Sequence, residues 1–258
     1  MAGADEAEHA DLTVVTFNVH GRAAGWSARR RLLLDELAAL NPDVVSLQEL
    51  RTFPSHGRWI QRSLSMRAGE GGPFHFLGAR KRGTRGYESI GLLTRLAVLE
   101  SRVLMLGVGG RVALRARLVS PGGRPFDFYA THFQHGGGAE AARLQASRVI
   151  LEGIAQRDIP AVVAGDLNAG PTSETINALF GQLRSAHAGI HGQEPERTVP
   201  TDPARPGAVL DYILVTPDIK VLSAARAFEA RDSADRTASD HYGLVARLSL
   251  TAVQSVDQ

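Results

Sequence analysis

Residues 160–171 read PAVVAGDLNAGP, a short apolar run that ends in a polar turn. The run 160–164 is apolar and partly β-branched, which predicts a buried strand. Gly165, and Gly170 before Pro171, indicate that the chain turns away from the sheet there. Asp166 and Asn168 therefore stand where a strand ends. Such residues are often only turn formers, so the stretch needs support from the rest of the chain.

Five more predicted strands carry polar side chains at or near one end. They are Asn18 after 12–17, Glu49 after 43–47, His132 after 126–131, Asp211 within 209–215, and Asp240 and His241 before 244–250. Each residue alone is usually a turn former or a structural histidine. A carboxylate inside an apolar strand needs a partner, however, and independent turns explain the repeated pattern poorly. The pattern predicts that these groups meet at one site.

The remaining segments predict the fold class. Helices are expected over 27–40, 57–67, 139–156 and 173–180, and further strands over 90–94 and 112–118. In the last strand, arginines alternate with apolar residues, which predicts a half-exposed strand. Many short strands without strict alternation with helices favour an α/β (α+β) fold of two packed mixed β-sheets with outer helices. We predict a flexible N-terminal tail (1–11), a single domain (12–251) and a C-terminal tail (252–258).

The composition limits the chemistry. The 258 residues include no cysteine, so disulfides and thiolate metal sites are excluded. Any metal must bind to oxygen or imidazole ligands, which favours Mg²⁺, Mn²⁺ or Ca²⁺. The 29 Lys and Arg barely exceed the 27 Asp and Glu, so net charge alone does not indicate a nucleic-acid partner. Without a signal peptide or an apolar run of ~20 residues, we expect a cytoplasmic protein with no membrane span; oligomeric state is not predicted.

The ordered set TFNVH, QE, TH, GDLNA, LDYI and SDH resembles the signature of the endonuclease/exonuclease/phosphatase superfamily, which includes deoxyribonuclease I. The resemblance spans residues 12–250, and its strength lies in six pieces in the right order and spacing. It implies a four-layered sandwich in which both sheets end at one cleft. It also implies hydrolysis of phosphate esters by an activated water, with Mg²⁺ or Mn²⁺ as cofactor and Ca²⁺ as a further candidate.

The resemblance assigns roles on the metal side of the site. Glu49 would be the main metal ligand, with Asn18 beside it. Asp166 would orient and deprotonate the attacking water, and Asn168 would bind the scissile phosphate. Asp240 would join the metal ligands or hold the neighbouring histidine.

Two histidines would act on the phosphate. His241, oriented by Asp211, would donate hydrogen bonds to it, and His132 would lie on the leaving-group side. A histidine held by a carboxylate keeps a raised pKa, so one or two imidazolium groups could stabilise charge on the phosphoryl oxygens. Details similar to deoxyribonuclease I suggest that Glu88 orients His132 and that Arg51 contacts a DNA groove.

Other details limit the substrate. Where AP endonucleases have an acidic second metal ligand, this chain has His20, so cutting at abasic sites is disfavoured. A nuclease is the first hypothesis, supported by Arg51 and by the basic segment 80–85. A phospholipid head-group or small phosphate-ester hydrolase of the same fold is the alternative. An inactive binding scaffold is disfavoured, because it would be expected to have lost Glu49, Asp166 or His241.

Overall fold

The computed structural model describes residues 11–67, 72–83, 87–200 and 207–250. The first strand begins at Asp11, one residue inside the predicted N-terminal tail. The predicted C-terminal tail and Arg85 of the basic segment lie outside the described residues. Among the described residues, no helix combines the length and the apolar character needed to cross a bilayer.

Twelve strands in the described ranges form two six-stranded mixed sheets. The first sheet has the order β11-β12-β1-β2-β4-β3. Its strands are β1 (Asp11–Asn18), β2 (Val44–Arg51), β3 (His75–Arg80), β4 (Glu88–Thr94), β11 (Lys220–Ala227) and β12 (Gly243–Ser249). The second has the order β5-β6-β7-β8-β10-β9. Its strands are β5 (Val98–Met105), β6 (Val112–Val119), β7 (Pro125–His132), β8 (Ala161–Asp166), β9 (Arg184–Ser185) and β10 (Asp211–Val215).

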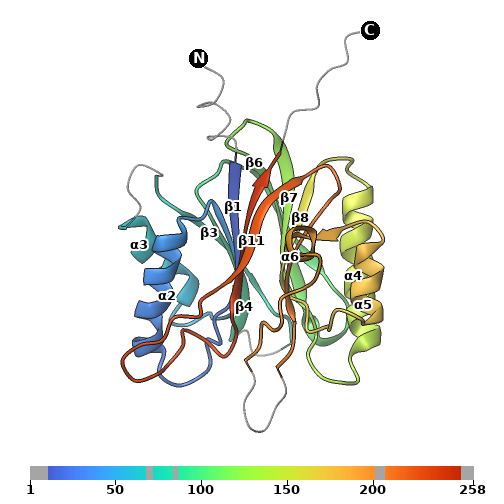
Figure 1. The fold of residues 1–258 in the computed structure, drawn as a ribbon. Coiled ribbons are helices and arrows are strands. Elements are labelled where there is room, and N and C mark those ends of the chain that lie inside the picture. The colour runs from blue at the N-terminus through green and yellow to red at the C-terminus, as the bar shows by residue number, and fades with distance from the viewer. Residues whose placement is uncertain (1–10, 68–71, 84–86, 201–206, 251–258) are drawn as a thin grey trace, which may run out of the picture.

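Helices cover the outer faces of both sheets. In Figure 1, α2 (Trp26–Leu40) and α3 (His56–Ser65) lie on one side of the paired sheets, and α4 (Glu140–Ala155) and α5 (Glu174–Phe180) lie on the other. A short helix, α6 (Ala186–His191), follows β9, and a 3-10 turn, η1 (Val108–Gly110), precedes β6. The predicted four-layered sandwich of two packed mixed sheets with outer helices is confirmed.

Three apolar clusters hold these layers together. One lies between the sheets, and its members include Val14, Phe128 and Ala164. The second packs α4 and α5 on the second sheet, and the third packs α2 and α3 on the first. All six residues of β8 are buried because the strand is covered on both faces. This is why its sequence is a continuous apolar run and lacks strand-like alternation.

The prediction of a half-exposed β6 is wrong. The side chain of Arg115 is only 3% exposed. It forms an ion pair with Asp127 at 3.2 Å, and it also donates to Glu100. Arg117 and Arg157 contact the same Asp127 carboxylate. The sequence alternation was real, but the arginine side chains of this strand contact neighbouring carboxylates instead of solvent.

Replacing Asp127 with asparagine should therefore destabilise the protein. The Asp127 side chain is 2% exposed and is the shared partner of three arginines. Removing one partner of a buried ion pair typically costs about 3–5 kcal/mol. Urea denaturation should show this loss, whereas Asp235→Asn should change the free energy of unfolding by less than about 1 kcal/mol, because its ion pair is exposed. Equal stability of the two variants would contradict this role.

Candidate active site

The ends of parallel strands bring polar side chains from both sheets together. β1 and β2 run parallel, as do β7 and β8, so each pair ends at one edge of its sheet. Asn18 is the last residue of β1, and Asp166 is the last of β8. The Asn18 amide donates to Asp166 Oδ2 over 3.0 Å and to Glu49 Oε1 over 3.3 Å. One side chain therefore links carboxylates of the two sheets.

Buried polar side chains next to this junction form hydrogen bonds within and between the two sheets. The hydroxyl of Ser46 on β2 donates to the backbone oxygen of Ala164 on β8 over 2.8 Å. The Gln48 amide donates to Ser46 and to Thr16 at 2.9 and 3.2 Å. These side chains are buried between the sheets. They fix the distance between β2 and β8, and hence the distance between the carboxylates at the strand ends.

Asp166 is buried and held by two donors. Besides Asn18, the backbone N–H of Asn168 donates to its Oδ1 over 2.9 Å. Burial raises the pKa of Asp166, and the nearby Asp211 raises it further, while His241 and the two donors act in the opposite direction. A carboxyl group whose pKa is raised toward neutrality is suited to accept a proton from water.

His241 and Asp211 form a buried pair beside Asp166. Asp211 begins β10, directly opposite Asp166 in the antiparallel ladder between β10 and β8. Its Oδ2 lies 2.8 Å from His241 Nδ1. Burial alone would lower the pKa of His241, but the charge and hydrogen bond of Asp211 raise it to about 10. His241 is therefore an imidazolium at neutral pH, with Nε2 free to act as a second donor.

Thr198 holds this pair in place, and the sequence analysis did not identify it. Its hydroxyl accepts from the backbone N–H groups of Leu210 and Asp211 at 2.9 and 3.1 Å. Its carbonyl accepts from the backbone N–H of Tyr242 over 2.7 Å. Thr198 thus fixes the residues on either side of the His241–Asp211 hydrogen bond. Nothing in the local sequence marks it, because it lies in an irregular segment far from both partners.

His132 also reaches Asp166, but in a different charge state. Its Nε2 lies 3.4 Å from Asp166 Oδ2. Burial, together with the positive charges of Arg111 and His241, lowers the pKa of His132 well below its ordinary value. The two histidines expected to share the phosphate thus differ. His241 carries a positive charge at neutral pH, and His132 does not.

Glu88 faces His132 through a longer contact than the sequence analysis expected. Glu88 Oε1 lies 3.7 Å from His132 Nδ1, beyond hydrogen-bond length. The same oxygen accepts from Arg111 Nη1 over 2.8 Å. Arg111 also lies near Gln134 and His135 at 3.4 and 3.3 Å. Arg111 is therefore a second residue missed from the sequence, where its place in the β6 alternation suggested a solvent-exposed side chain.

Asp240 contacts neither His241 nor Glu49 through a hydrogen bond. Its Oδ1 lies 2.9 Å from Nδ1 of His20, and the hydroxyl of Ser239 donates to the same oxygen over 3.2 Å. The Asp240 carboxylate, by accepting a hydrogen bond from the His20 ring, raises the pKa of His20. This partly exposed histidine–carboxylate pair borders the site, at the position where the sequence analysis noted a departure from AP endonucleases.

The predicted basic contacts lie at the rim. Arg51 ends β2, directly opposite Glu88 in the ladder with β4, and its side chain is exposed. Lys81 is half-buried, and burial together with Arg111 lowers its pKa. The charges of Glu88 and Glu49 also act on Lys81. Arg51 and Lys81 thus offer positive charge near the carboxylates.

The backbone at the site takes an uncommon conformation. His20, Glu49 and Asn168 have φ angles of 48°, 54° and 49°, in the left-handed region. Non-glycine residues adopt this region at a cost and persist there only where the surroundings hold them. At Asn168 the side chain is anchored by a 3.2 Å hydrogen bond to the backbone oxygen of Phe133.

Comparison with known proteins decides the family. The sequence model of the Endonuclease/Exonuclease/phosphatase family matches residues 15–241. The chain belongs to the endonuclease/exonuclease/phosphatase family. A search of curated proteins gave no match.

Several solved structures share the fold of this chain. The human Nocturnin catalytic domain with a bound sulfate anion is 23% identical, with a TM-score of 0.78 over 94% of this chain and 96% of that one. Danio rerio TDP2 complexed with a single-strand DNA product is 22% identical, with a TM-score of 0.78 over 93% and 99%. The Bacteroides thetaiotaomicron mannosyl-6-phosphatase is 18% identical, with a TM-score of 0.72 over 92% and 99%. At these identities the likeness concerns the fold.

One group of residues in the described part of the endonuclease/exonuclease/phosphatase site could hold a metal ion. Ligand atoms of Asp166, Asp211 and His241 lie within 4.8 Å of one another. His241 Nδ1 and Asp211 are already hydrogen-bonded, and the raised pKa of His241 means that a cation would compete with a proton there. The Glu49 carboxylate is only partly buried, and oxygen ligands suit a hard cation.

The pKa of His241 provides a direct test of the pair. Replacing Asp211 with asparagine should lower this pKa from about 10, because the largest influence that opposes burial is removed and only the charges of Asp166 and Asp240 still raise it. NMR titration of the imidazole Cε1–H signals would measure the change. In the wild type, the pair's contribution to stability should be present below pH 6.5 and lost as the pH rises to 10.

The matched control for this titration is Asp240→Asn. Asp240 is adjacent in sequence to His241, but its hydrogen bond goes to His20. It should lower the pKa of His241 much less than Asp211→Asn does. If both variants lowered the pKa of His241 equally, the negative charge of the surrounding carboxylates would explain the raised pKa. The hydrogen bond to Asp211 would then not be its specific cause.

Proposed function

We propose that this phosphoesterase is a metal-dependent phosphodiesterase that cleaves phosphate ester bonds by an activated water, and that its substrate is a nucleic acid. The observation that carries the proposal is the junction at the strand ends. There, the Asn18 amide joins Glu49 to Asp166, and the His241–Asp211 pair lies beside Asp166. A basic carboxylate, a fixed imidazolium and a ligand for a hard cation are the groups that phosphodiester hydrolysis needs.

The reaction requires a proton acceptor and a source of positive charge. Asp166 takes a proton from the attacking water. Hydrogen bonds from the Asn18 amide and from the Asn168 backbone N–H orient the Asp166 carboxylate. His241 donates through Nε2 to a phosphoryl oxygen and remains charged, because Asp211 holds Nδ1. As the new P–O bond forms, the bond to the leaving oxygen breaks, and that oxygen takes up a proton from solvent water. His132 Nε2 lies 3.4 Å from Asp166 Oδ2. This contact puts His132 on the side of the attacking water, because an in-line displacement places the leaving oxygen on the opposite side of the phosphorus.

The carboxylate of Glu49, which accepts from the Asn18 amide, would hold the metal ion. The Asn18 amide oxygen accepts from the backbone N–H of His20, so Asn18 would position Glu49 and would not bind the ion itself. A divalent cation there supplies positive charge that stabilises the phosphoryl oxygens and the ionised form of nearby carboxyl groups. The sequence composition and the oxygen-rich ligand set favour Mg²⁺ or Mn²⁺. Asp240 would not be a metal ligand. It would hold His20 at the rim of the site through their hydrogen bond.

Positive side chains at the rim support a nucleic-acid substrate. Arg51 is exposed and Lys81 half-buried on the β2–β4 side of the site. They can contact phosphates on either side of the scissile one. A fold relative, Danio rerio TDP2, has been seen with a single-strand DNA product. Binding that rests on such contacts should weaken steeply as salt concentration rises.

A small phosphate ester is the second candidate, because a cavity adjoins the site. This cavity measures about 340 Å³, and His20, Arg29 and Asp240 are among its lining residues. That volume lies at the lower end of the range for small-molecule pockets. One fold relative is a mannosyl-6-phosphatase. A cavity with an arginine and a histidine beside the reacting phosphate would suit a phosphorylated small molecule.

A substrate panel tests the proposal. Plasmid, single-stranded DNA, RNA, sphingomyelin, inositol phosphates and a sugar phosphate would each be incubated with Mg²⁺ or with EDTA. We expect metal-dependent cleavage of a nucleic acid, with a rate that falls between 50 and 200 mM salt. Cleavage of the sugar phosphate alone would favour the second candidate. Absence of activity on every substrate and on bis-p-nitrophenyl phosphate would reject both in favour of an inactive scaffold.

A further inference from the structure

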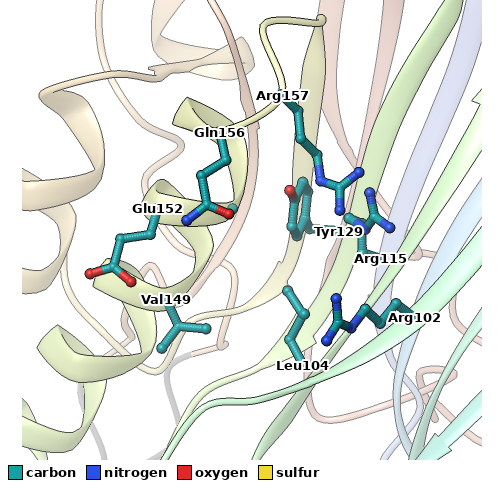
Figure 2. Close-up of a pocket in the computed structure, with 9 residues that line it drawn as sticks. Arg102, Leu104, Arg115, Tyr129, Val149, Glu152, Gln156 and Arg157 are labelled. Carbon is teal, nitrogen blue, oxygen red and sulfur yellow. The ribbon is translucent and has the colours of Figure 1, made fainter.

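A second polar pocket lies on the outer face of the second sheet, away from the strand-end junction. It measures about 210 Å³, and its lining residues include Arg102, Arg115, Tyr129, Gly153 and Arg157. β5, β6 and β7 supply the first three, and α4 with the residues after it supplies the others. Figure 2 shows the guanidinium groups of Arg115 and Arg157 next to the Tyr129 ring, with Arg102 nearby.

Strand register builds the charged wall of this pocket. Arg102 lies directly opposite Arg115, and Arg115 lies directly opposite Tyr129. The three side chains therefore form one row across the sheet, on the face that α4 covers. Like charges directly opposite one another are unfavourable unless a negative group offsets them.

Neighbouring carboxylates offset only part of this charge. The adjacent row across the sheet contains Glu100 and Asp127. These two carboxylates form ion pairs with Arg115, Arg117 and Arg157. Arg102 forms no ion pair with any residue in the described ranges. The two carboxylates, Glu100 and Asp127, are therefore too few to balance the positive charges of the four arginines, at positions 102, 115, 117 and 157. Glu152 is exposed on the helix side and lies away from the guanidinium groups in Figure 2.

Two buried donors at the pocket have no partner within the described part of the chain. They are the hydroxyl of Tyr129, which is fully buried, and Nε of Arg115. An unpaired buried polar group costs free energy comparable to a lost hydrogen bond, so such donors are usually matched by a ligand or water. Burial raises the pKa of Tyr129 to about 12, which keeps its hydroxyl protonated. Gly153 leaves space above this hydroxyl, because an added Cβ would lie only 3.2 Å from it.

We propose that this pocket binds a phosphate-sized oxyanion, held by Arg102, Arg115 and the Tyr129 hydroxyl. The planar guanidinium of an arginine presents donors that match the oxygens of phosphate. The pocket is smaller than the usual range for drug-sized ligands, so it suits inorganic phosphate or the phosphate group of a small monoester. It lies on the outer face of the sheet, so it constitutes a second anion site independent of the proposed hydrolysis.

Two-dimensional NMR with inorganic phosphate, in EDTA, would test the site. In the wild type, the backbone signals of Val149 and Gly153 should shift saturably with phosphate concentration. Tyr129→Phe and Arg102→Gln should weaken this binding about tenfold or more, because a hydrogen bond to a charged group is worth roughly that factor. Neither change removes a partner of the buried Asp127. A parallel titration with glycerol 3-phosphate would show whether a monoester binds more tightly than the free ion.

Arg148→Gln is the matched control, because it removes one positive charge from the exposed face of α4 without lining the pocket. It should leave phosphate binding unchanged. Three results would overturn the proposal: shifts confined to the signals of Asn168 and His241, shifts that do not saturate, or equal affinity in Arg102→Gln, Tyr129→Phe and the wild type.

Discussion

Replacing Asp166 with asparagine should lower kcat for bis-p-nitrophenyl phosphate by about 10²–10⁴-fold, the range for losing a general base. The substitution keeps the shape of the side chain and its ability to accept from Asn168 N–H, but asparagine cannot take a proton from water. The protein should remain folded, because the change removes a buried carboxyl group whose pKa is already raised. Initial rates at saturating Mg²⁺ would measure the loss.

Asp158→Asn is the control for that measurement. Asp158 is exposed and has a left-handed φ of 48°, which asparagine tolerates well. It should keep wild-type activity. Activity within a factor of about three of wild type in the Asp166 variant would show that another group activates the water.

Replacing Glu49 with glutamine should weaken Mn²⁺ binding and lower the metal-dependent rate by at least about 100-fold. Even residues that only support a metal ligand typically change affinity 10–100-fold, and a direct ligand should do more. Glutamine retains an oxygen that can accept from the Asn18 amide, so the geometry of the strand ends should persist. Calorimetric titration with Mn²⁺ would measure affinity, and EDTA should abolish activity of the wild type.

Glu174→Gln provides the comparison for Glu49→Gln. Glu174 is exposed in the first turn of α5 and lies outside the site. It should bind Mn²⁺ as the wild type does. Unchanged Mn²⁺ affinity in the Glu49 variant would instead favour the Asp166, Asp211 and His241 group as the ion site.

Strongly patterned elements could be predicted from the sequence. The strand before Asp166 is a continuous apolar run because sheet and helices cover both its faces. In α4 the buried residues recur at the helical spacing: Arg143, Ala146, Ser147, Ile150 and Ile154. The edge strands β3, β5 and β11 were not predicted. They expose many of their residues, so their sequences alternate less and contain more charge. These segments become strands because they pair with neighbouring strands of the sheet, and a local sequence pattern does not show that pairing.

The candidate site shows the same division. Residues at strand ends could be predicted, because their place in the chain fixes their place at the sheet edge. Arg111 and Thr198 could not, because they act through contacts between distant segments. The different charge states of His132 and His241 also depend on environment. One is buried among positive charges, and the other is held by Asp211.

Crystals grown with Mn²⁺ and inorganic phosphate would test the central claim most directly, through the anomalous signal of the metal. The account predicts an ion against the Glu49 carboxylate on the side facing Asp166, with the phosphate within reach of His241 and the His241–Asp211 hydrogen bond intact. An ion that instead separated His241 from Asp211, or one bound away from Glu49 in an active enzyme, would contradict it.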